Sequence, residues 1–401
     1  MTKKIVSFRL MQLTSILERN NLVAQEHFLK AGNDYEIARK IALPNSNIHT
    51  IVVADFSSGS QKTLFRWEGT GVEPRLHAID PDLDPPVRAQ KSARFEAMPF
   101  DCDFVRPINS MTKSFTALAF FKAVGDYKRL SITDDIPLSR FYPELGKSCP
   151  LRVGHVLNMA KSFDWDEHKA DYRSPENPMR QLLQSTDPVG LVLERIAQWQ
   201  TRPDARVDEV SVYNGGCTTL LMDMTEQLIN DRVGQRSITL NSGKTLADFA
   251  EEALFQPLGI RAKWASFTAS RRVSGSGGLE MSPNDLLKVA GYLFSERPDL
   301  LRRLLDNKIP SIRPGRFYSG QFWISQLATS DGSTVDMISM SGVGGQRLSL
   351  IPSLKVAIGM TGGNYNQTGL DNCLPDSPIV GGYLLPAVGI NLVTFQGVEL
   401  T

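Results

Sequence analysis

The chain has 401 residues, of which 41% are hydrophobic and 22% are charged, a composition typical of globular proteins. Its 44 Lys and Arg residues are balanced by 43 Asp and Glu residues, which gives a formal net charge of +1. This balance argues against binding to nucleic acid or to an anionic membrane, because both attract a basic surplus. The length predicts two domains or one large one.

Cysteine and histidine usage gives no sign of a metal centre. The four cysteines form no CxxC pair and no Cys/His cluster at metal-ligand spacing; they are Cys102, Cys149, Cys217 and Cys373. We therefore predict free thiols in a reducing compartment, which favours the cytoplasm, and we expect neither a metal nor an organic cofactor. No uninterrupted apolar run approaches the ~20 residues of a membrane span.

The first hundred residues predict one helix and one pair of strands. Residues 1–20 place leucines on one helical face. Residues 48–71 have the pattern of a strand, a turn at 57–60 and a second strand. The next segment, 72–104, is rich in Pro, Asp and Arg and shows little periodicity, so we interpret it as irregular.

The middle of the chain predicts helices, and its last third predicts strands. From Ser110 onward apolar residues fall on one helical face, and residues 126–260 look mainly helical with long polar loops. Within them, residues 243–260 have the pattern of an amphipathic helix that ends at a Pro-Leu-Gly sequence. Residues 274–294 predict a turn followed by a helix, and short β-rich runs separated by turns cover 320–363.

These patterns predict an α+β fold. Because strand-rich ends flank a helical middle, we expect a sheet domain built from residues 1–125 and 261–401, with a helical insertion domain at 126–260. A body with two such parts leaves a cleft between them, which is a common location for a substrate.

A serine three residues before a lysine begins the predicted central helix, in the sequence Ser110-Met111-Thr112-Lys113. Positions i and i+3 share a helical face, so the hydroxyl and the amine can meet. Serine becomes a nucleophile when a base takes its proton, and lysine acts as that base when desolvation or nearby positive charge lowers its pKa. The alternative is an ordinary helix start with a capping serine and a solvated lysine, since Ser-x-x-Lys alone is a weak signal.

Two later segments have the residue types of a catalytic site. Tyr213 stands just before a Gly-Gly turn and an apolar helix, and a phenol beside a lysine can pass a proton to a leaving group. The alternative is a tyrosine that packs at the entrance of a helix. Gly342, Gly344 and Gly345 lie between two predicted strands. Glycines there allow close approach of the backbone to a ligand, or they simply form a tight turn.

The order of these three motifs resembles the serine β-lactamase and penicillin-binding-protein superfamily, which carries Ser-x-x-Lys. The likeness covers most of the chain and is closest to class C β-lactamases, β-lactamase-like carboxylesterases and 6-aminohexanoate-oligomer hydrolases. "INSMTKSFTALAF" resembles the nucleophile helix of this branch, "LSITDDIPLSRFYPEL" resembles its L-x-L-D-D-x-V segment, and "GKTLADFAEEALFQPLGI" resembles a later signature. The resemblance implies a β-lactamase-like fold, an antiparallel sheet flanked by helices plus an all-helical insertion, with the active site in the cleft.

The resemblance also implies roles for individual residues. Ser110 is the acylated nucleophile, Lys113 its base and Tyr213 the proton relay. The oxyanion lies between the backbone N–H of Ser110 and one near Val343. The other substrate contacts that it implies are Asn214, Ser341, Gly342, Gly344 and Tyr172. Tyr172 falls in a long polar stretch where oligomer hydrolases of this branch carry a mobile loop, and a surface tyrosine is the alternative reading.

The sequence departs from the family pattern at three places. The second motif is usually Tyr-x-Asn, but this chain has Gly215 there, so an amide contact to substrate is missing or comes from Asn214. The third motif usually begins with Lys or His, and we align Met340-Ser341-Gly342 with it. Without that cation, recognition of a β-lactam carboxylate is weakened. Ala160-Lys161-Ser162 replaces the Ser-Gly turn of the family.

We therefore predict a serine hydrolase that cleaves an ester or amide through an acyl-enzyme at Ser110 and is not a true β-lactamase. One alternative is an acyltransferase that uses the same acyl-enzyme with an alcohol or amine acceptor. A second alternative is a non-catalytic binding protein on the same scaffold. A Ser-His-Asp enzyme is a weaker rival, because the chain has no G-x-S-x-G motif. The expected partner is a small-molecule ester, amide or acyl donor, and the sequence indicates no oligomeric state.

Overall fold

The computed structural model describes most of the chain, in two compact units. The described residues are 3–30, 47–76, 93–126, 132–167, 170, 174–236, 243–266, 272–313, 315–363 and 378–393. Unit 1 consists of Met1–Ile108, Met281–Leu301 and Ser325–Thr401. Unit 2 consists of Asn109–Glu280 and Arg302–Ile324.

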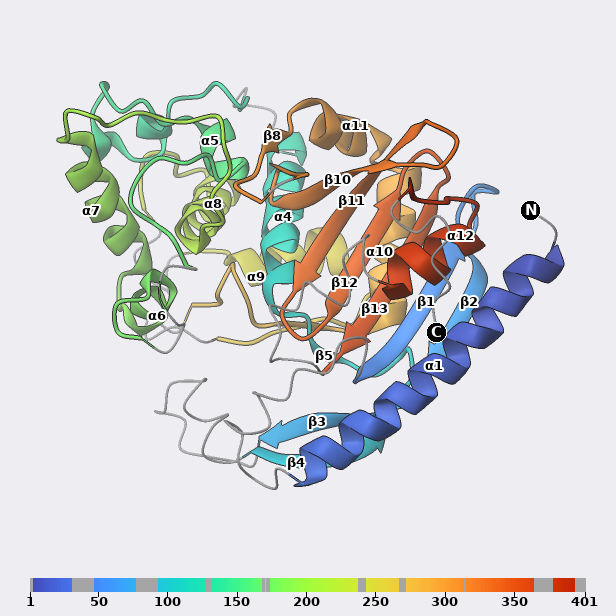
Figure 1. Ribbon diagram of the computed structural model, residues 1–401. Helices are drawn as coiled ribbons and strands as arrows, with labels where there is room; N and C mark the ends of the chain where they lie inside the picture. The colour runs from blue at the N-terminus through green and yellow to red at the C-terminus, as the bar shows by residue number, and fades with distance from the viewer. Residues whose placement is uncertain are drawn as a thin grey trace. The chain divides into compact units, whose positions relative to one another are not determined.

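Five neighbouring strands of unit 1 form an antiparallel sheet (Figure 1). Their order across the sheet is β2 (Lys62–Glu68), β1 (Ile48–Asp55), β13 (Val356–Gly362), β12 (Gln346–Ile351) and β11 (Thr334–Gly342). β1 pairs with both β2 and β13, so segments from opposite ends of the sequence lie side by side. Every residue of β12 and β13 is buried, as expected when both faces of a sheet are covered.

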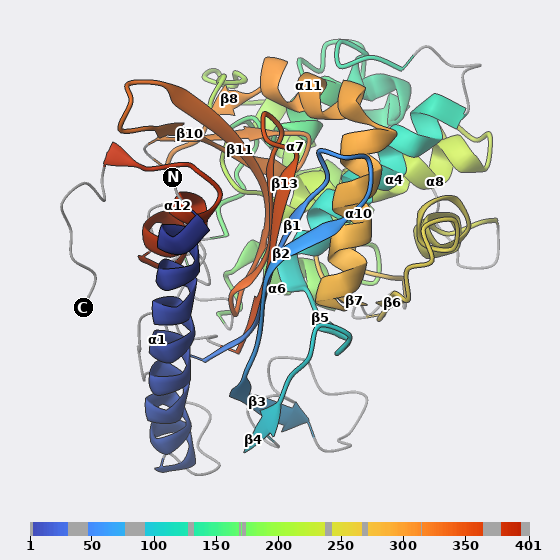
Figure 2. The same cartoon turned by 90° about the vertical axis from the view of Figure 1, so that its right-hand side faces the viewer.

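Helices cover both faces of this sheet, as Figure 2 shows. The helices of unit 1 are α1 (Lys3–Lys30), α10 (Pro283–Ser295), the π-helix η5 (Pro378–Leu384) and α12 (Leu385–Ala387). α10 packs on β1, β12 and β13, whereas α1 contacts η5 and α12 on the other face. Leu13 and Leu17 of α1 are fully buried in a core cluster that includes Ile51 and Ile358 of the sheet. The predicted N-terminal helix with a buried leucine face is therefore confirmed.

A second ladder in unit 1 corrects one prediction. β3 (Thr70–Leu76) and β4 (Ala93–Pro99) pair antiparallel, so the irregular interpretation of residues 72–104 was wrong for these strands. Proline removes a backbone donor and is therefore confined to edge strands. Both strands of a two-stranded ladder are edges, which explains how Pro74 and Pro99 fit there.

Unit 2 is mainly helical. Its α-helices are α4 (Thr112–Asp126), α5 (Val153–Leu157), α6 (Pro178–Gln184), α7 (Pro188–Gln200), α8 (Gly215–Ile229) and α9 (Leu246–Ala250). Its shorter helices are the 3-10 helices η1 (Asn109–Met111), η2 (Leu138–Arg140) and η3 (Pro143–Leu145) and the π-helix η4 (Glu251–Phe255). Its strands are β6 (Lys263–Trp264), β8 (Ile309–Pro310) and β9 (Arg316–Ser319). The remaining elements are β5 (Arg106–Pro107) of unit 1, and β7 (Leu279–Met281), α11 (Pro298–Asp306) and β10 (Phe322–Ala328), which have residues in both units.

α8 lies at the centre of unit 2. It packs on α4, α5, α6, α7 and α9, and all 15 of its residues are buried. Buried polar groups require hydrogen-bond partners, and those of α8 have them. Tyr142 Oη donates to the Asp223 carboxylate at 3.1 Å, and Gln227 Nε2 donates to the same carboxylate at 2.8 Å. The residues that begin α8 and α4 are thereby held by a well-packed core.

The predicted α+β class is confirmed, with an antiparallel sheet flanked by helices and a mainly helical segment. The two units divide the chain at other places than the predicted domains, because α4 and η1 group with the helical segment through the contacts of α4 with α8 and α9. The predicted domain limits and the cleft between the domains stay predictions.

Candidate active site

Ser110 lies in the 3-10 helix η1, which leads directly into α4. Asn109 has a φ of 52°, in the left-handed region that Asn adopts more readily than most residues. Thr112 Oγ1 donates a hydrogen bond to the Asn109 carbonyl at 2.6 Å, which fixes this turn. The first turns of α4 are buried, but Ser110 is only half-buried. Its hydroxyl is thus held at the partly exposed start of a buried helix.

Lys113 lies one turn after Ser110 and reaches back to it, as the i, i+3 spacing predicts. Lys113 Nζ lies 3.4 Å from Ser110 Oγ, and it donates to the carbonyl of Ser276 at 3.3 Å. The residue is only 3% exposed. It is hydrogen-bonded to Tyr213, and its Nζ lies 4.6 Å from the centroid of the Tyr213 ring. The structure therefore brings the three predicted catalytic residues together within unit 2.

The charge state of Lys113 differs from the one that we expected for a free base. Burial lowers the pKa of Lys113, but the Tyr213 hydroxyl and the Glu167 carboxylate raise it by more, so this pKa lies above its usual value of 10.5. Lys113 is therefore an ammonium at neutral pH. A proton from Ser110 can then be accepted only by Lys113 and Tyr213 acting as a hydrogen-bonded pair.

Tyr213 belongs to a cluster of three aromatic side chains in unit 2. Its ring stacks on Trp323 at a centroid distance of 5.7 Å and meets Tyr318 edge-on at 6.3 Å. Arg313 covers the Trp323 ring at 5.4 Å. Tyr318 is buried, whereas Trp323 is only half-buried. Trp323 therefore presents part of an aromatic surface beside Tyr213.

Asn214 is the N-cap of α8. Its side-chain oxygen accepts a hydrogen bond from the backbone N–H of Cys217 at 3.0 Å, and the residue is buried. Such a cap satisfies one of the free donors at a helix start. Asn214 Oδ1 thus fixes the geometry of the segment that carries Tyr213, and the predicted contact of Asn214 with substrate stays a prediction.

Sequence reasoning missed Glu167, a carboxylate only 1% exposed. Its Oε1 accepts hydrogen bonds from the backbone N–H of Gly215 and from Trp165 Nε1, the latter at 3.2 Å. The signal that could have found it is Gly215 itself. A Cβ on Gly215 would lie 2.6 Å from Glu167 Oε1, so glycine leaves the room that this carboxylate occupies.

The residues of the third motif lie in unit 1. Ser341 and Gly342 end β11, where Gly342 pairs with Gln346 of β12. Val343 in the following turn is 42% exposed, and Gly344 has a φ of 94°, which glycine adopts without strain. The glycines thus make a tight turn that leaves Val343 accessible. The oxyanion and substrate roles of these residues stay predictions.

The remaining predictions fall partly outside the described residues. Tyr172 and Cys373 lie outside them. Among the described residues, no group of three or more His, Cys, Asp and Glu side chains is arranged to hold a metal ion. None of the helices in the same part of the chain combines the length and hydrophobicity needed to cross a membrane.

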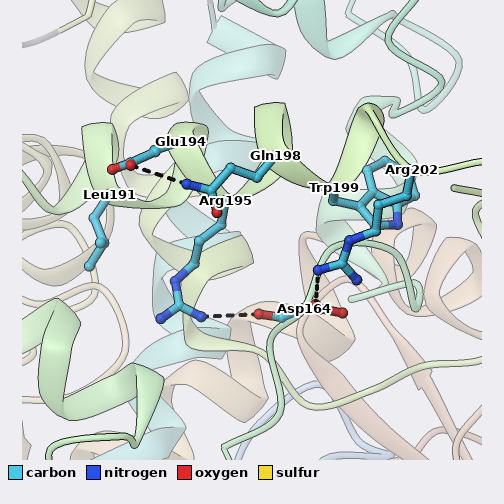
Figure 3. Close-up of a pocket in the computed structure, with 7 residues that line it drawn as sticks. All are labelled: Asp164, Leu191, Glu194, Arg195, Gln198, Trp199 and Arg202. Atoms are coloured by element: carbon cyan, nitrogen blue, oxygen red, sulfur yellow. Dashed lines mark hydrogen bonds and ion pairs between the residues drawn. The ribbon is translucent and has the colours of Figure 1, made fainter.

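A pocket beside α7 contains none of the predicted catalytic residues (Figure 3). It is lined by Asp164, Leu191, Glu194, Arg195, Gln198, Trp199 and Arg202. Figure 3 shows that both arginines reach Asp164: Arg195 donates to its carbonyl at 3.1 Å, and Arg202 forms an ion pair with its carboxylate at 2.5 Å. Both arginines of this pocket therefore have protein partners, and its lining includes none of the residues predicted for catalysis.

Comparisons with known proteins show which solved structures have a similar fold. No protein-family model and no curated protein sequence matches the chain. A D-amino acid amidase from Ochrobactrum anthropi SV3 is 16% identical with a TM-score of 0.53, over 91% of this chain and 96% of the amidase. An octameric penicillin-binding protein homologue from Pyrococcus abyssi is 17% identical with a TM-score of 0.57, over 88% of this chain and 75% of the homologue.

A third similar structure comes from Bacillus anthracis and is described as a 6-aminohexanoate-dimer hydrolase. It is 16% identical with a TM-score of 0.52, over 80% of this chain and 74% of that protein. At these identities the likeness is one of fold, and it confirms at that level the resemblance predicted from the motifs. The chain has the fold of the serine β-lactamase and penicillin-binding-protein superfamily.

Proposed function

We propose that this protein is a serine hydrolase that cleaves an ester or amide bond through an acyl-enzyme on Ser110. One observation carries the proposal: Lys113 Nζ lies 3.4 Å from Ser110 Oγ and is also hydrogen-bonded to Tyr213. A serine hydroxyl needs a base within hydrogen-bond reach to act as a nucleophile. The superfamily fold supports the same assignment.

In the proposed reaction, Ser110 Oγ attacks the carbonyl carbon while the Lys113–Tyr213 pair takes its proton. The reactive form of the pair holds one proton fewer than a phenol with an ammonium. The carbonyl π electrons move onto oxygen, and they return when the C–O or C–N bond to the leaving group breaks. The pair passes its proton to that leaving group. Water then attacks the acyl carbon and gives one proton to the pair. The bond between the acyl carbon and Ser110 Oγ breaks, and the pair returns that proton to Oγ, which leaves free Ser110 and a carboxylic acid.

The substrate class follows from two features of the chain. Met340, at the place where the family carries Lys or His, has no charge with which to bind a β-lactam carboxylate, so we propose esters or amides as substrates. The half-buried Trp323 beside Tyr213 favours an apolar or aromatic acyl group, because stacking on an aromatic ring adds affinity. The amide substrates named for the D-amino acid amidase and the dimer hydrolase of similar fold suit this proposal.

Hydrolysis of matched esters and amides tests the proposal. We expect purified protein to release acid from an activated aryl ester, and Ser110→Ala to reduce the rate to that of the buffer. Ser162→Ala is the control, because Ser162 is also half-buried and its hydroxyl bonds only the carbonyl of Ala160 among the described residues. Equal rates for Ser110→Ala and wild type would overturn the proposal. Adding an amine acceptor and analysing the products separates hydrolysis from acyl transfer.

We also propose a cytoplasmic location. The thiols of Cys102, Cys149 and Cys217 are free and buried, which supports a reducing compartment. Thiol alkylation of the denatured protein, purified without reductant, tests this point. We expect four alkylated cysteines, and fewer would argue against the location.

A further inference from the structure

Glu167 is a buried carboxylate that the proposed reaction does not use. Burying a charged carboxylate is unfavourable unless hydrogen bonds and an opposite charge compensate for the lost water. Two donors bond Oε1, the backbone N–H of Gly215 and the indole Nε1 of Trp165. Asn177 Nδ2 donates to the Glu167 carbonyl at 3.0 Å, so the main chain of this residue is fixed as well.

The carboxylate occupies the space in which a side chain at position 215 would begin. A Cβ placed on Gly215 would lie 2.6 Å from Glu167 Oε1 and 2.8 Å from Met179 Sδ, closer than real Cβ contacts. The asparagine that the family carries at this position could not be built beside Glu167. Gly215 and Glu167 therefore depend on each other: the glycine leaves space, and the Glu167 carboxylate occupies the place of the asparagine amide of the family.

Trp165 holds the carboxylate from its other side. The indole is buried, and its ring lies 5.1 Å from the guanidinium of Arg195 on α7. Trp165 also packs closely on the backbone at Gly216, where an added Cβ would lie 2.9 Å from the ring. These contacts with α8 and Arg195 hold the indole in the orientation in which its N–H donates to Glu167.

The charge of Glu167 acts on the groups around the nucleophile. Burial lowers the pKa of Lys113, but Tyr213 and then the Glu167 carboxylate raise it above its usual value. Burial, followed by Glu167, raises the pKa of the Cys217 thiol. The pKa of Tyr318 is raised by burial first and then by Tyr213 and Glu167. Among Lys113, Cys217 and Tyr318, only Lys113 carries a positive charge. It is hydrogen-bonded both to Ser110 and to Tyr213.

We infer that Glu167 is a positioning residue of the active site, whose carboxylate takes the place left by Gly215, holds the start of α8 behind Tyr213 and supplies the counter-charge to Lys113. This inference rests on the proposed function. The carboxylate is linked to the site through Lys113, whose pKa Tyr213 and then Glu167 raise, so we expect it to act through the Lys113–Tyr213 pair. A merely structural glutamate would stabilise the fold without changing how that pair takes up protons.

The pH dependence of fluorophosphonate labelling in wild type and Glu167→Gln tests the inference. Glutamine keeps the shape and the acceptor oxygen but removes the charge, so Lys113 loses its proton more easily. The rising limb of the labelling rate should move to lower pH by about one unit, which makes the variant about tenfold faster below its midpoint. Asp166→Asn is the matched control, because Asp166 is the adjacent carboxylate but is exposed to solvent. We expect it to keep the wild-type midpoint.

A direct measurement keeps the inference separate from the proposed function. Titration of the Lys113 Nζ signal by ¹⁵N NMR should show a lower pKa in Glu167→Gln than in wild type, whether or not the protein has esterase activity. An unchanged pKa of Lys113, together with an unchanged labelling midpoint, would overturn the inference and leave Ser110 as the nucleophile. Wild-type protein that is never labelled, with Lys113 still shifted by the substitution, would sink the proposed function instead.

A double-mutant cycle covers the case in which Glu167→Gln fails to fold. Gly215→Ala should destabilise the wild type, because the new Cβ meets the carboxylate, and it should destabilise Glu167→Ala much less. The double variant should therefore be more stable than the sum of the two single effects predicts. Additive effects would show that Gly215 and Glu167 do not share one space, and that result would overturn the inference.

Discussion

Two buried basic side chains, His49 in unit 1 and Lys113 in unit 2, have pKa values that are shifted in opposite directions. In unit 1, His49 is fully buried, stacks on Phe100 at a centroid distance of 3.7 Å and accepts a hydrogen bond from Arg106. Burial, followed by the positive charge of Arg106, holds the pKa of His49 well below its usual value of 6.5. In unit 2, burial also lowers the pKa of Lys113, but Tyr213 and Glu167 reverse the outcome.

The difference shows that burial alone does not decide the charge of a basic group. Desolvation disfavours the cation at both places, and the sign of the neighbouring charge then selects the result. A second cation keeps His49 neutral, which suits a packed and stacked ring. Tyr213, followed by the Glu167 carboxylate, keeps Lys113 charged next to the half-buried Ser110. The first arrangement belongs to a packed core, and the second lies beside the serine that we propose as the nucleophile.

The largest expected effect comes from removing the buried cation of unit 2. Lys113→Met should lower the fluorophosphonate labelling rate by roughly 10²–10⁴-fold, the usual contribution of a positioned proton-transfer group. Lys122→Met on the same helix is the control, since Lys122 pairs with Asp126 away from Ser110. Comparison of second-order labelling rates checks the prediction. Equal rates for the two variants would place the base elsewhere.

Alanine substitution of the glycines beside His49 and Glu167 should have an effect of intermediate size. A Cβ on Gly71 would lie 2.3 Å from His49 Cδ2, just as one on Gly215 would meet Glu167. Gly71→Ala and Gly215→Ala should each reduce the free energy of unfolding by about 1–3 kcal/mol through overpacking. Gly277→Ala, with no atom within 4 Å of the new Cβ, should be neutral. Denaturant unfolding checks the three values.

The rate of fluorophosphonate labelling then distinguishes Gly71→Ala from Gly215→Ala. After correction for the folded fraction, Gly71→Ala should label at the wild-type rate, whereas Gly215→Ala should shift the labelling midpoint. A changed labelling midpoint in Gly71→Ala would show that His49 and Lys113 are coupled, contrary to the account in which each is set by its own neighbours.

The smallest expected effect is the pH dependence of stability due to His49. The unfolded chain binds a proton near pH 6.5, but the folded chain holds His49 neutral to lower pH. The unfolded state therefore binds more protons below pH 6.5, and stability should fall by up to about 1.4 kcal/mol per pH unit as pH decreases from there. His49→Gln should flatten this slope between pH 5 and 6.5 in denaturant titrations. A slope that persists unchanged would assign it to other groups.

The sequence predicts local structure well where periodicity is strong. Apolar patterns predict the helix that follows Ser110, the N-terminal helix with its leucine face and the strands of the main sheet. Ser110 and Lys113 meet because their spacing is fixed within one helix. Tyr213 joins them because the buried helix α8 that it precedes packs on α4.

The sequence did not predict the features that depend on contacts between distant segments. Glu167 precedes Gly215 by 48 positions and lies in a stretch without periodicity, so no local pattern marks it as a neighbour of α8. β3 and β4 were hidden by prolines that only an edge position tolerates. The raised pKa of Lys113 depends on Glu167 as well, so an interpretation that lacked this carboxylate expected the opposite shift.

The most direct test of the central claim is the mass of the intact protein after exposure to a fluorophosphonate, with wild type beside Ser110→Ala. The account predicts a single adduct on wild type and none on Ser110→Ala, with both proteins folded as judged by circular dichroism. An adduct that persists in Ser110→Ala, or none on folded wild-type protein at any pH, would contradict an activated Ser110.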